Sequence, residues 1–142
     1  TIAAAMEASM SGVPALAVSL CEWGWEDYLP AARVALRVAE WAREHPLPKG
    51  AVYSLNVPAL PYGEIRGVRP AMLSPMFIGK PDFSRVETEA GVRYQFIGGT
   101  DEPLDDPSYD TTKVGQGFAT LTTLTWNLRL SGPDPDTSGI RL

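Results

Sequence analysis

The sequence has a single cysteine, a single histidine and no long run of apolar residues. One cysteine excludes an intrachain disulfide and a multi-cysteine zinc site, and no apolar run approaches the roughly 20 residues that a transmembrane helix needs. Basic residues are also few: the chain has 12 Lys and Arg and 17 Asp and Glu, which gives a net charge of −5. Duplex nucleic acids bind to clustered Lys and Arg, so we expect no contact with a duplex or with a membrane.

The rest of the composition is that of an ordinary globular domain, with 44% hydrophobic and 20% charged residues. Because no basic region precedes the first apolar stretch, no signal peptide is indicated and we expect a cytoplasmic protein. Cys21 ends an apolar run and is predicted to be a small buried side chain. His45 lies in a Pro-rich segment and is predicted to lie at the surface. No Ser-His-Asp set, P-loop or dinucleotide-binding glycine motif can be assembled.

The first twenty residues predict a helix, a turn and a strand. Residues 2–11 are rich in strong helix formers, with Thr1 in the N-cap position and Gly12 as the stop signal. The apolar run VPALAVSL that follows is typical of a strand buried on both faces. A helix, a tight turn and a buried strand in this order indicate a parallel α/β sheet.

A second helix is predicted within residues 25–44, because its charged and apolar residues fall on opposite faces. The charged face holds Arg33, Arg37, Glu40 and Glu44, and the apolar face holds Tyr28, Ala31, Ala35, Val38 and Ala42. A second strand follows in GAVYSLNVP and ends at Pro58. This part of the chain therefore continues the α/β pattern.

The character of the sequence changes after about residue 60. Extended stretches on either side of Glu89-Ala90-Gly91 predict a hairpin, and DTTKVGQG predicts a short helix after Asp110. The last strand is predicted from the alternation of Leu124, Trp126, Leu128 and Leu130 with Thr125, Asn127 and Arg129. We divide the chain into an α/β segment (residues 1–60), a β-rich arm with a closing helix-strand segment (61–130) and a flexible tail (131–142).

Three features have the chemistry of a binding site. An acidic stretch carries five carboxylates, at Asp101, Glu102, Asp105, Asp106 and Asp110. Its spacing lacks the alternating ligands and central Gly of a calcium loop, so a solvated loop is favoured and cation binding is the alternative. Trp23 and Trp25 could form an aromatic wall over a ligand or cover the end of a sheet. Thr1, at a helix N-terminus, is a candidate phosphate-binding residue, and plain capping is its alternative.

In order along the chain, three segments resemble the SurE family of survival-protein nucleotidases. TIAAAMEASMSGVPALAVSL is similar to that family's helix-turn-strand segment, SLNVPALP to its Asn-x-Asn-x-Pro strand, and DTTKVGQGFATLTTL to its closing helix and strand. Three positions depart from the family pattern, with Ser54 in place of the first Asn, Thr112 in place of Asp, and Thr123 in place of Pro. The resemblance covers about residues 1–130.

The resemblance implies a doubly wound, Rossmann-like α/β sandwich of SurE type, of which this chain is the C-terminal portion. Residues 1–60 would then be the second half of its Rossmann-like core. It implies metal-dependent hydrolysis of nucleoside 5′- or 3′-monophosphates, with Mg²⁺ or Mn²⁺ held by residues upstream of Thr1. No catalytic or metal-binding residue is then assigned within this chain, which alone is expected to be inactive. The resemblance also implies a homodimer or homotetramer built through the arm. The alternative is a non-catalytic oligomerisation or ligand-binding module that keeps the SurE-like shell.

Overall fold

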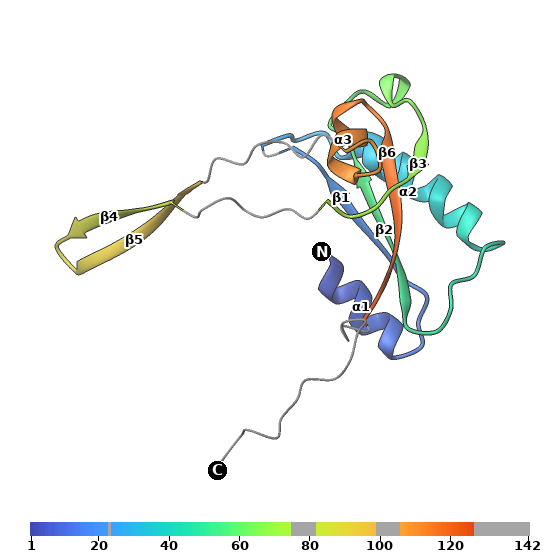
Figure 1. The fold of residues 1–142 in the computed structure, drawn as a ribbon, viewed down its shortest axis with the longest axis horizontal. Coiled ribbons are helices and arrows are strands. Elements are labelled where there is room, and N and C mark those ends of the chain that lie inside the picture. The colour runs from blue at the N-terminus through green and yellow to red at the C-terminus, as the bar shows by residue number, and fades with distance from the viewer. Residues whose placement is uncertain (23, 75–81, 99–105, 127–142) are drawn as a thin grey trace, which may run out of the picture.

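The computed structural model describes residues 1–22, 24–74, 82–98 and 106–126. These residues form a four-stranded sheet, three α-helices, one short 3-10 helix and a separate two-stranded hairpin (Figure 1). Trp23, three carboxylates of the acidic stretch (Asp101, Glu102 and Asp105) and the tail at 131–142 lie outside these ranges, as does the end of the strand predicted beyond Trp126. Within them, no helix has both the length and the apolar character needed to span a bilayer.

The sheet has the order β1-β2-β6-β3 and mixes parallel and antiparallel pairs. Strand β1 (Leu16–Leu20) is parallel to β2 (Ala51–Val57), and β6 (Ala119–Thr125) is antiparallel to β2. Strand β3 (Val68–Pro70) is parallel to β6, and the 3-10 helix η1 (Tyr62–Glu64) precedes it. Hence β3 and β6, which the sequence analysis grouped with the arm, lie in the same sheet as β1 and β2. The division of the chain at residue 60 stays a prediction.

Helix α1 (Ile2–Met10) ends as its sequence predicts. Gly12 adopts a φ of 83°, which an L side chain rarely tolerates. Its N–H donates to the Ser9 carbonyl (3.0 Å) and the Val13 N–H to the Ala8 carbonyl (3.0 Å). These two bonds form the Schellman motif that satisfies the last carbonyls of a helix, so the turn into β1 is encoded by one glycine.

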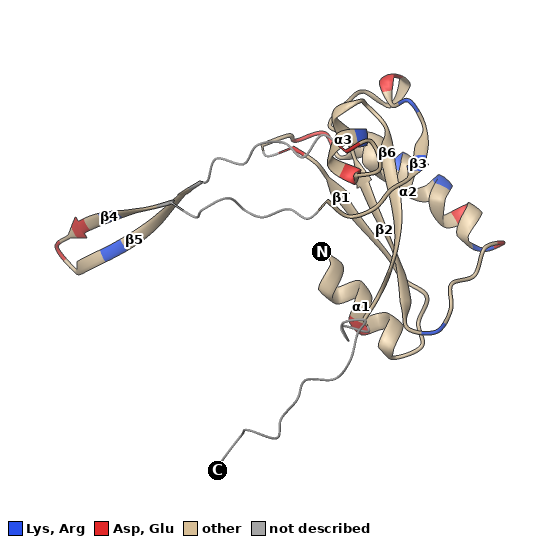
Figure 2. Ribbon diagram, in the orientation of Figure 1, with Lys and Arg blue, Asp and Glu red and all other residues tan. Residues whose placement is uncertain are grey.

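Helix α2 (Leu29–Ala42) packs against the sheet through a strip of small apolar side chains. Its buried residues Ala31, Val34 and Val38 meet Leu55 and Val57 of β2, and these two side chains are fully buried. The charged residues Arg33, Arg37 and Glu40 are exposed, as expected for the opposite face of the helix. Figure 2 marks the charged positions along α2. Tyr28 was expected on the apolar face and is 65% exposed, because it lies at the N-cap before the helical periodicity begins.

Strand β1 is less buried than the sequence predicts, since only Ala17 is buried and the other four residues are half-buried. The reason is its place in the sheet: among the described residues β1 pairs with β2 alone, so its other edge has no neighbouring strand.

The face of the sheet opposite α2 is also more polar than expected. Register places the polar side chains of Ser19, Ser54, Asn56, Thr120 and Thr122 on this face.

The predicted hairpin is confirmed as β4 (Asp82–Thr88) and β5 (Gly91–Gly98). Figure 1 shows the hairpin apart from the four-stranded sheet. Gly91 has a φ of 122°, which explains why the turn needs glycine. Large side chains remain exposed along the hairpin, namely Phe83, Val92, Tyr94, Phe96 and Ile97. An isolated two-stranded hairpin is marginally stable in water, so this surface is suited to a contact with other protein.

Candidate functional site

Two polar side chains meet where β2 ends: Asn56, for which no role was predicted, and Asp110, a member of the acidic stretch. Asn56 is the second-last residue of β2, and Asp110 begins α3 (Asp110–Gly115). The Asn56 Nδ2 donates to Asp110 Oδ2 at 3.0 Å, across 54 residues of sequence. Parallel α/β sheets bind ligands at the carboxyl ends of their strands, and this pair lies at that edge. We call Asn56, Asp110 and Cys21 the carboxyl-edge site.

The local sequence explains how Asp110 reaches this position. Met72 and Tyr109 form an isolated bridge, in which the Asp110 N–H donates to the Met72 carbonyl at 2.9 Å. The second carboxylate oxygen, Oδ1, accepts from the backbone N–H groups of Ser74 (2.9 Å) and Thr111 (2.8 Å). Asp110 is only 7% exposed. Its carboxylate therefore ties β2, the segment after β3 and the start of α3 together.

The same contacts fix the orientation of the Asn56 amide. An ionised carboxylate only accepts hydrogen bonds, so the Asn56 NH₂ group must face Asp110. The Asn56 Oδ1 then lies on the other side of the amide, where it can accept a hydrogen bond. Asn56 is half-buried and follows Ser54, its neighbour on the same face, by two residues.

Cys21 follows β1 at the same edge. Its N–H donates to the Val57 carbonyl at 2.9 Å, but its side chain is exposed rather than buried as predicted, because the sheet ends there. The protein that surrounds its sulfur still raises the pKa of the thiol above its ordinary value of 9.0, and the Asp110 carboxylate raises it further. A separate hydrogen bond between the sulfur and the backbone of Val57 acts in the opposite direction. The thiol is therefore protonated at neutral pH and is a poor nucleophile.

This pKa shift predicts slow alkylation of the only cysteine. Only the thiolate reacts with iodoacetamide, so the rate of alkylation follows the ionisation of Cys21. The rate should reach half its maximum above pH 9.0, the ordinary pKa of a thiol. The measurement is the rate against pH, followed by mass spectrometry, with a free cysteine peptide as control. A midpoint at or below that of the peptide would contradict the prediction.

The other sequence candidates lie elsewhere or act structurally. Thr1 is at the N-cap of α1, is exposed and makes no capping hydrogen bond, and Figure 1 shows this end of α1 apart from α3. Asp106 is exposed and accepts from the Ser108 N–H and hydroxyl, which lowers the pKa of its carboxyl. The Trp25 indole donates to the Asp27 carbonyl (3.0 Å), and His45 is exposed as predicted, stacked on the Trp41 ring.

A metal ion does not fit the residues present. Across the described ranges, no three His, Cys, Asp or Glu side chains are grouped so that they could hold a cation together. The Asp110 carboxylate is the best placed acid, but both of its oxygens already accept hydrogen bonds from N–H donors. The two described members of the acidic stretch, Asp106 and Asp110, differ in exposure and in partners. They give no support to a shared cation site.

Comparison with known proteins decides the family. The model of the family described as "Survival protein SurE" matches residues 1–77, which is more than half of the chain. The chain belongs to the SurE family. A protein named 5′-nucleotidase SurE from Synechococcus sp. (strain JA-3-3Ab) is 36% identical over 124 residues, which cover 87% of this chain and 48% of that protein. A protein of the same name from Gloeobacter violaceus is 35% identical over 129 residues, which cover 90% of this chain and 49% of that protein.

A solved structure confirms the SurE-like α/β fold. The crystal structure of the SurE protein from Aquifex aeolicus superposes with a TM-score of 0.75 at 21% identity, over 91% of this chain and 52% of that one. The chain therefore spans about half the length of the SurE relatives that it matches.

Two local patterns in the sequence point to the carboxyl-edge site. A strand that stops at Pro58 places Asn56 near its carboxyl end, where ligands bind in α/β sheets. Asp110 directly precedes a short helical pattern, a common position for a hydrogen-bonded carboxylate. Both residues lie in segments that resemble the SurE family, so their meeting could have been proposed.

Proposed function

We propose that the protein containing this chain is a metal-dependent phosphohydrolase that acts on nucleoside 5′- or 3′-monophosphates. The observation that carries the proposal is the SurE family match over residues 1–77, together with relatives named 5′-nucleotidase SurE. The Asn56–Asp110 pair at the carboxyl edge of the sheet supports it, because ligands of α/β sheets bind at that edge. Since the chain spans about half of these relatives, the activity is proposed for the whole protein.

The residues of this chain would contribute binding rather than the chemical step. With its NH₂ group fixed on Asp110, Asn56 presents Oδ1 as a rigid acceptor for a hydroxyl such as those of ribose. Thr1 and the free N–H groups of the first turn of α1 are suited to a phosphate group. A divalent metal, Mg²⁺ or Mn²⁺, would neutralise charge on the phosphoryl group when bound. We expect its ligands upstream of Thr1, because the residues described here do not form a cation site.

Oligomerisation and location belong to the same proposal. We infer a homodimer or homotetramer in which the β4–β5 hairpin contacts another copy, and the exposed Phe83, Tyr94 and Phe96 support this role. We also propose a cytoplasmic location, with which the single cysteine of the chain is compatible.

The decisive test is release of inorganic phosphate from nucleoside 5′- and 3′-monophosphates by the whole protein. We expect release with Mn²⁺ or Mg²⁺, its loss on addition of EDTA and its recovery when metal is restored. Residues 1–142 alone, checked for folding by circular dichroism, should release none.

Two results would contradict this account. Release by residues 1–142 alone would show that the chain holds its own metal site. No release by the whole protein with either metal would remove the enzyme and leave the alternative, a non-catalytic oligomerisation or ligand-binding module with a SurE-like shell.

A further inference from the structure

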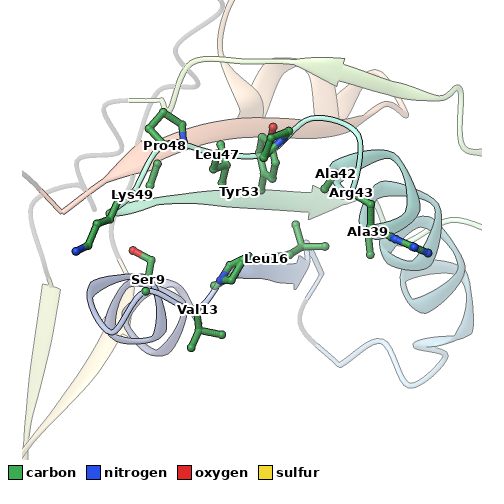
Figure 3. A pocket seen from close by; sticks show the side chains of 16 residues that line it. Ser9, Val13, Leu16, Ala39, Ala42, Arg43, Leu47, Pro48, Lys49 and Tyr53 are labelled. Carbon is green, nitrogen blue, oxygen red and sulfur yellow. The ribbon is translucent and has the colours of Figure 1, made fainter.

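A pocket of about 760 Å³ lies at the opposite end of the sheet from the carboxyl-edge site. It is formed by the last residues of α1 and α2, the turn from Gly12 to Ala15, the beginnings of β1 and β2, and the Pro-rich segment 46–50 (Figure 3). This volume is within the usual range of small-molecule sites. The pocket is therefore large enough for a ligand and separate from the proposed nucleotide site.

The lining of the pocket is mostly apolar. Its side chains include those of Val13, Pro14, Leu16, Ala39, Ala42 and Leu47. Pro46 and Pro48 restrict the backbone of the segment that closes it. Tyr53 lies at its floor with its hydroxyl donating to the His45 carbonyl at 3.0 Å, so this polar group is already satisfied. Such a lining favours a ligand with an apolar body.

One buried polar group in the lining has no partner. The Ser9 side chain is 3% exposed, and its hydroxyl finds no hydrogen-bond partner in the described part of the chain. A buried hydroxyl without a partner costs free energy, and a ligand that brings an acceptor would remove this cost. Figure 3 shows the Ser9 side chain extending from α1 toward the strands.

The charge of the lining has one sign. Arg43 and Lys49 are its only charged residues, and neither takes part in a salt bridge within the described ranges. In Figure 3, Lys49 lies toward the same end of the pocket as Ser9, and Arg43 lies toward the other. In a chain with a net charge of −5, two unpaired cations at an apolar pocket favour an anionic group.

We propose that this pocket binds a small organic acid with an apolar body and one carboxylate. The apolar body fills the space between α1, α2 and β2, while the carboxylate accepts from the Ser9 hydroxyl and contacts Lys49. The site is independent of the proposed hydrolase activity, because it lies at the amino ends of β1 and β2.

The test compares three probes of equal chain length by titration calorimetry with the whole protein. Decanoate, 1-decanol and decyltrimethylammonium are used below the concentrations at which they aggregate. We expect one decanoate per chain, binding roughly tenfold more tightly than decanol, as for one charge-assisted hydrogen bond, and no binding of the cation. Equal binding of all three probes, or no binding of decanoate, would overturn the proposal.

Two pairs of variants locate the binding. Ala39→Trp on α2 fills the pocket and should abolish decanoate binding, whereas Ala32→Trp, exposed on the same helix and outside the lining, should leave it unchanged. Lys49→Gln should weaken decanoate roughly tenfold without affecting decanol, and Arg93→Gln on the hairpin should change neither. Circular dichroism confirms that each variant folds. Undiminished decanoate binding by folded Ala39→Trp would refute the site.

Discussion

Replacing Asp110 with Ala is expected to lower the free energy of unfolding of the protein by about 3 kcal/mol, since three N–H donors lose a charged acceptor at a buried position. Of these donors, the Ser74 N–H and the Asn56 amide are half-buried and regain water poorly. Thr111 is an exposed residue, so we expect its N–H to regain water more readily and to contribute less. The measurement is urea denaturation of the whole protein. The transition midpoint of the variant should lie below that of the wild type, while the slope of the unfolding free energy against urea concentration stays the same.

Asp106→Ala is the matched control for this change. Asp106 also accepts two hydrogen bonds, both from Ser108, but it is exposed. Its loss should therefore cost less than about 1 kcal/mol. Asp110→Ala should also move the alkylation midpoint of Cys21 to lower pH, because the carboxylate that disfavours the thiolate is gone. Equal losses of stability in the two variants would show that Asp110 does not tie the carboxyl edge together.

The second large effect is expected in the apolar core. Leu55 is fully buried between β2 and α2, where it packs in one cluster with Val34 and Val38. Leu55→Ala removes this contact and leaves a cavity, so the free energy of unfolding should fall by about 3–4 kcal/mol. Denaturation in urea, followed by the far-ultraviolet circular dichroism signal, measures the loss.

Leu36→Ala, on the helix that packs against Leu55, provides the comparison. Leu36 lies on α2 but is 62% exposed, so its truncation should change the stability by no more than about 0.5 kcal/mol. If both variants lost the same free energy, the packing of α2 on β2 would not be the main core of this region. The two leucines thus test the face of α2 that the structure assigns to the sheet.

The order of helices and strands could be predicted from the sequence because local chemistry specifies it. Gly12 ends α1, the spacing of Ala31 and Val38 marks the buried face of α2, and Pro58 stops β2. Each signal acts within a few residues. The hairpin turn before Gly91 is of the same kind.

The errors concern residues at the ends of helices and strands and contacts between distant parts of the chain. Cys21 was expected to be buried because its neighbours are apolar, but β1 ends just before it and its side chain reaches the surface. Tyr28 follows the helical spacing of α2 and yet precedes its first turn. The meeting of Asn56 with Asp110 spans 54 residues and needs the bridge between Met72 and Tyr109. A contact across so many residues leaves no periodic pattern in a short stretch of sequence.

The edge of β1 has a practical consequence for work with this chain. In the described residues, the five amino acids from Leu16 to Leu20 pair on one side only, and four of them are apolar. A free, apolar strand edge is a template for strands of other molecules. Residues 1–142 produced by themselves are therefore prone to join edge to edge and to aggregate. A charged substitution at the free edge should keep the chain in solution.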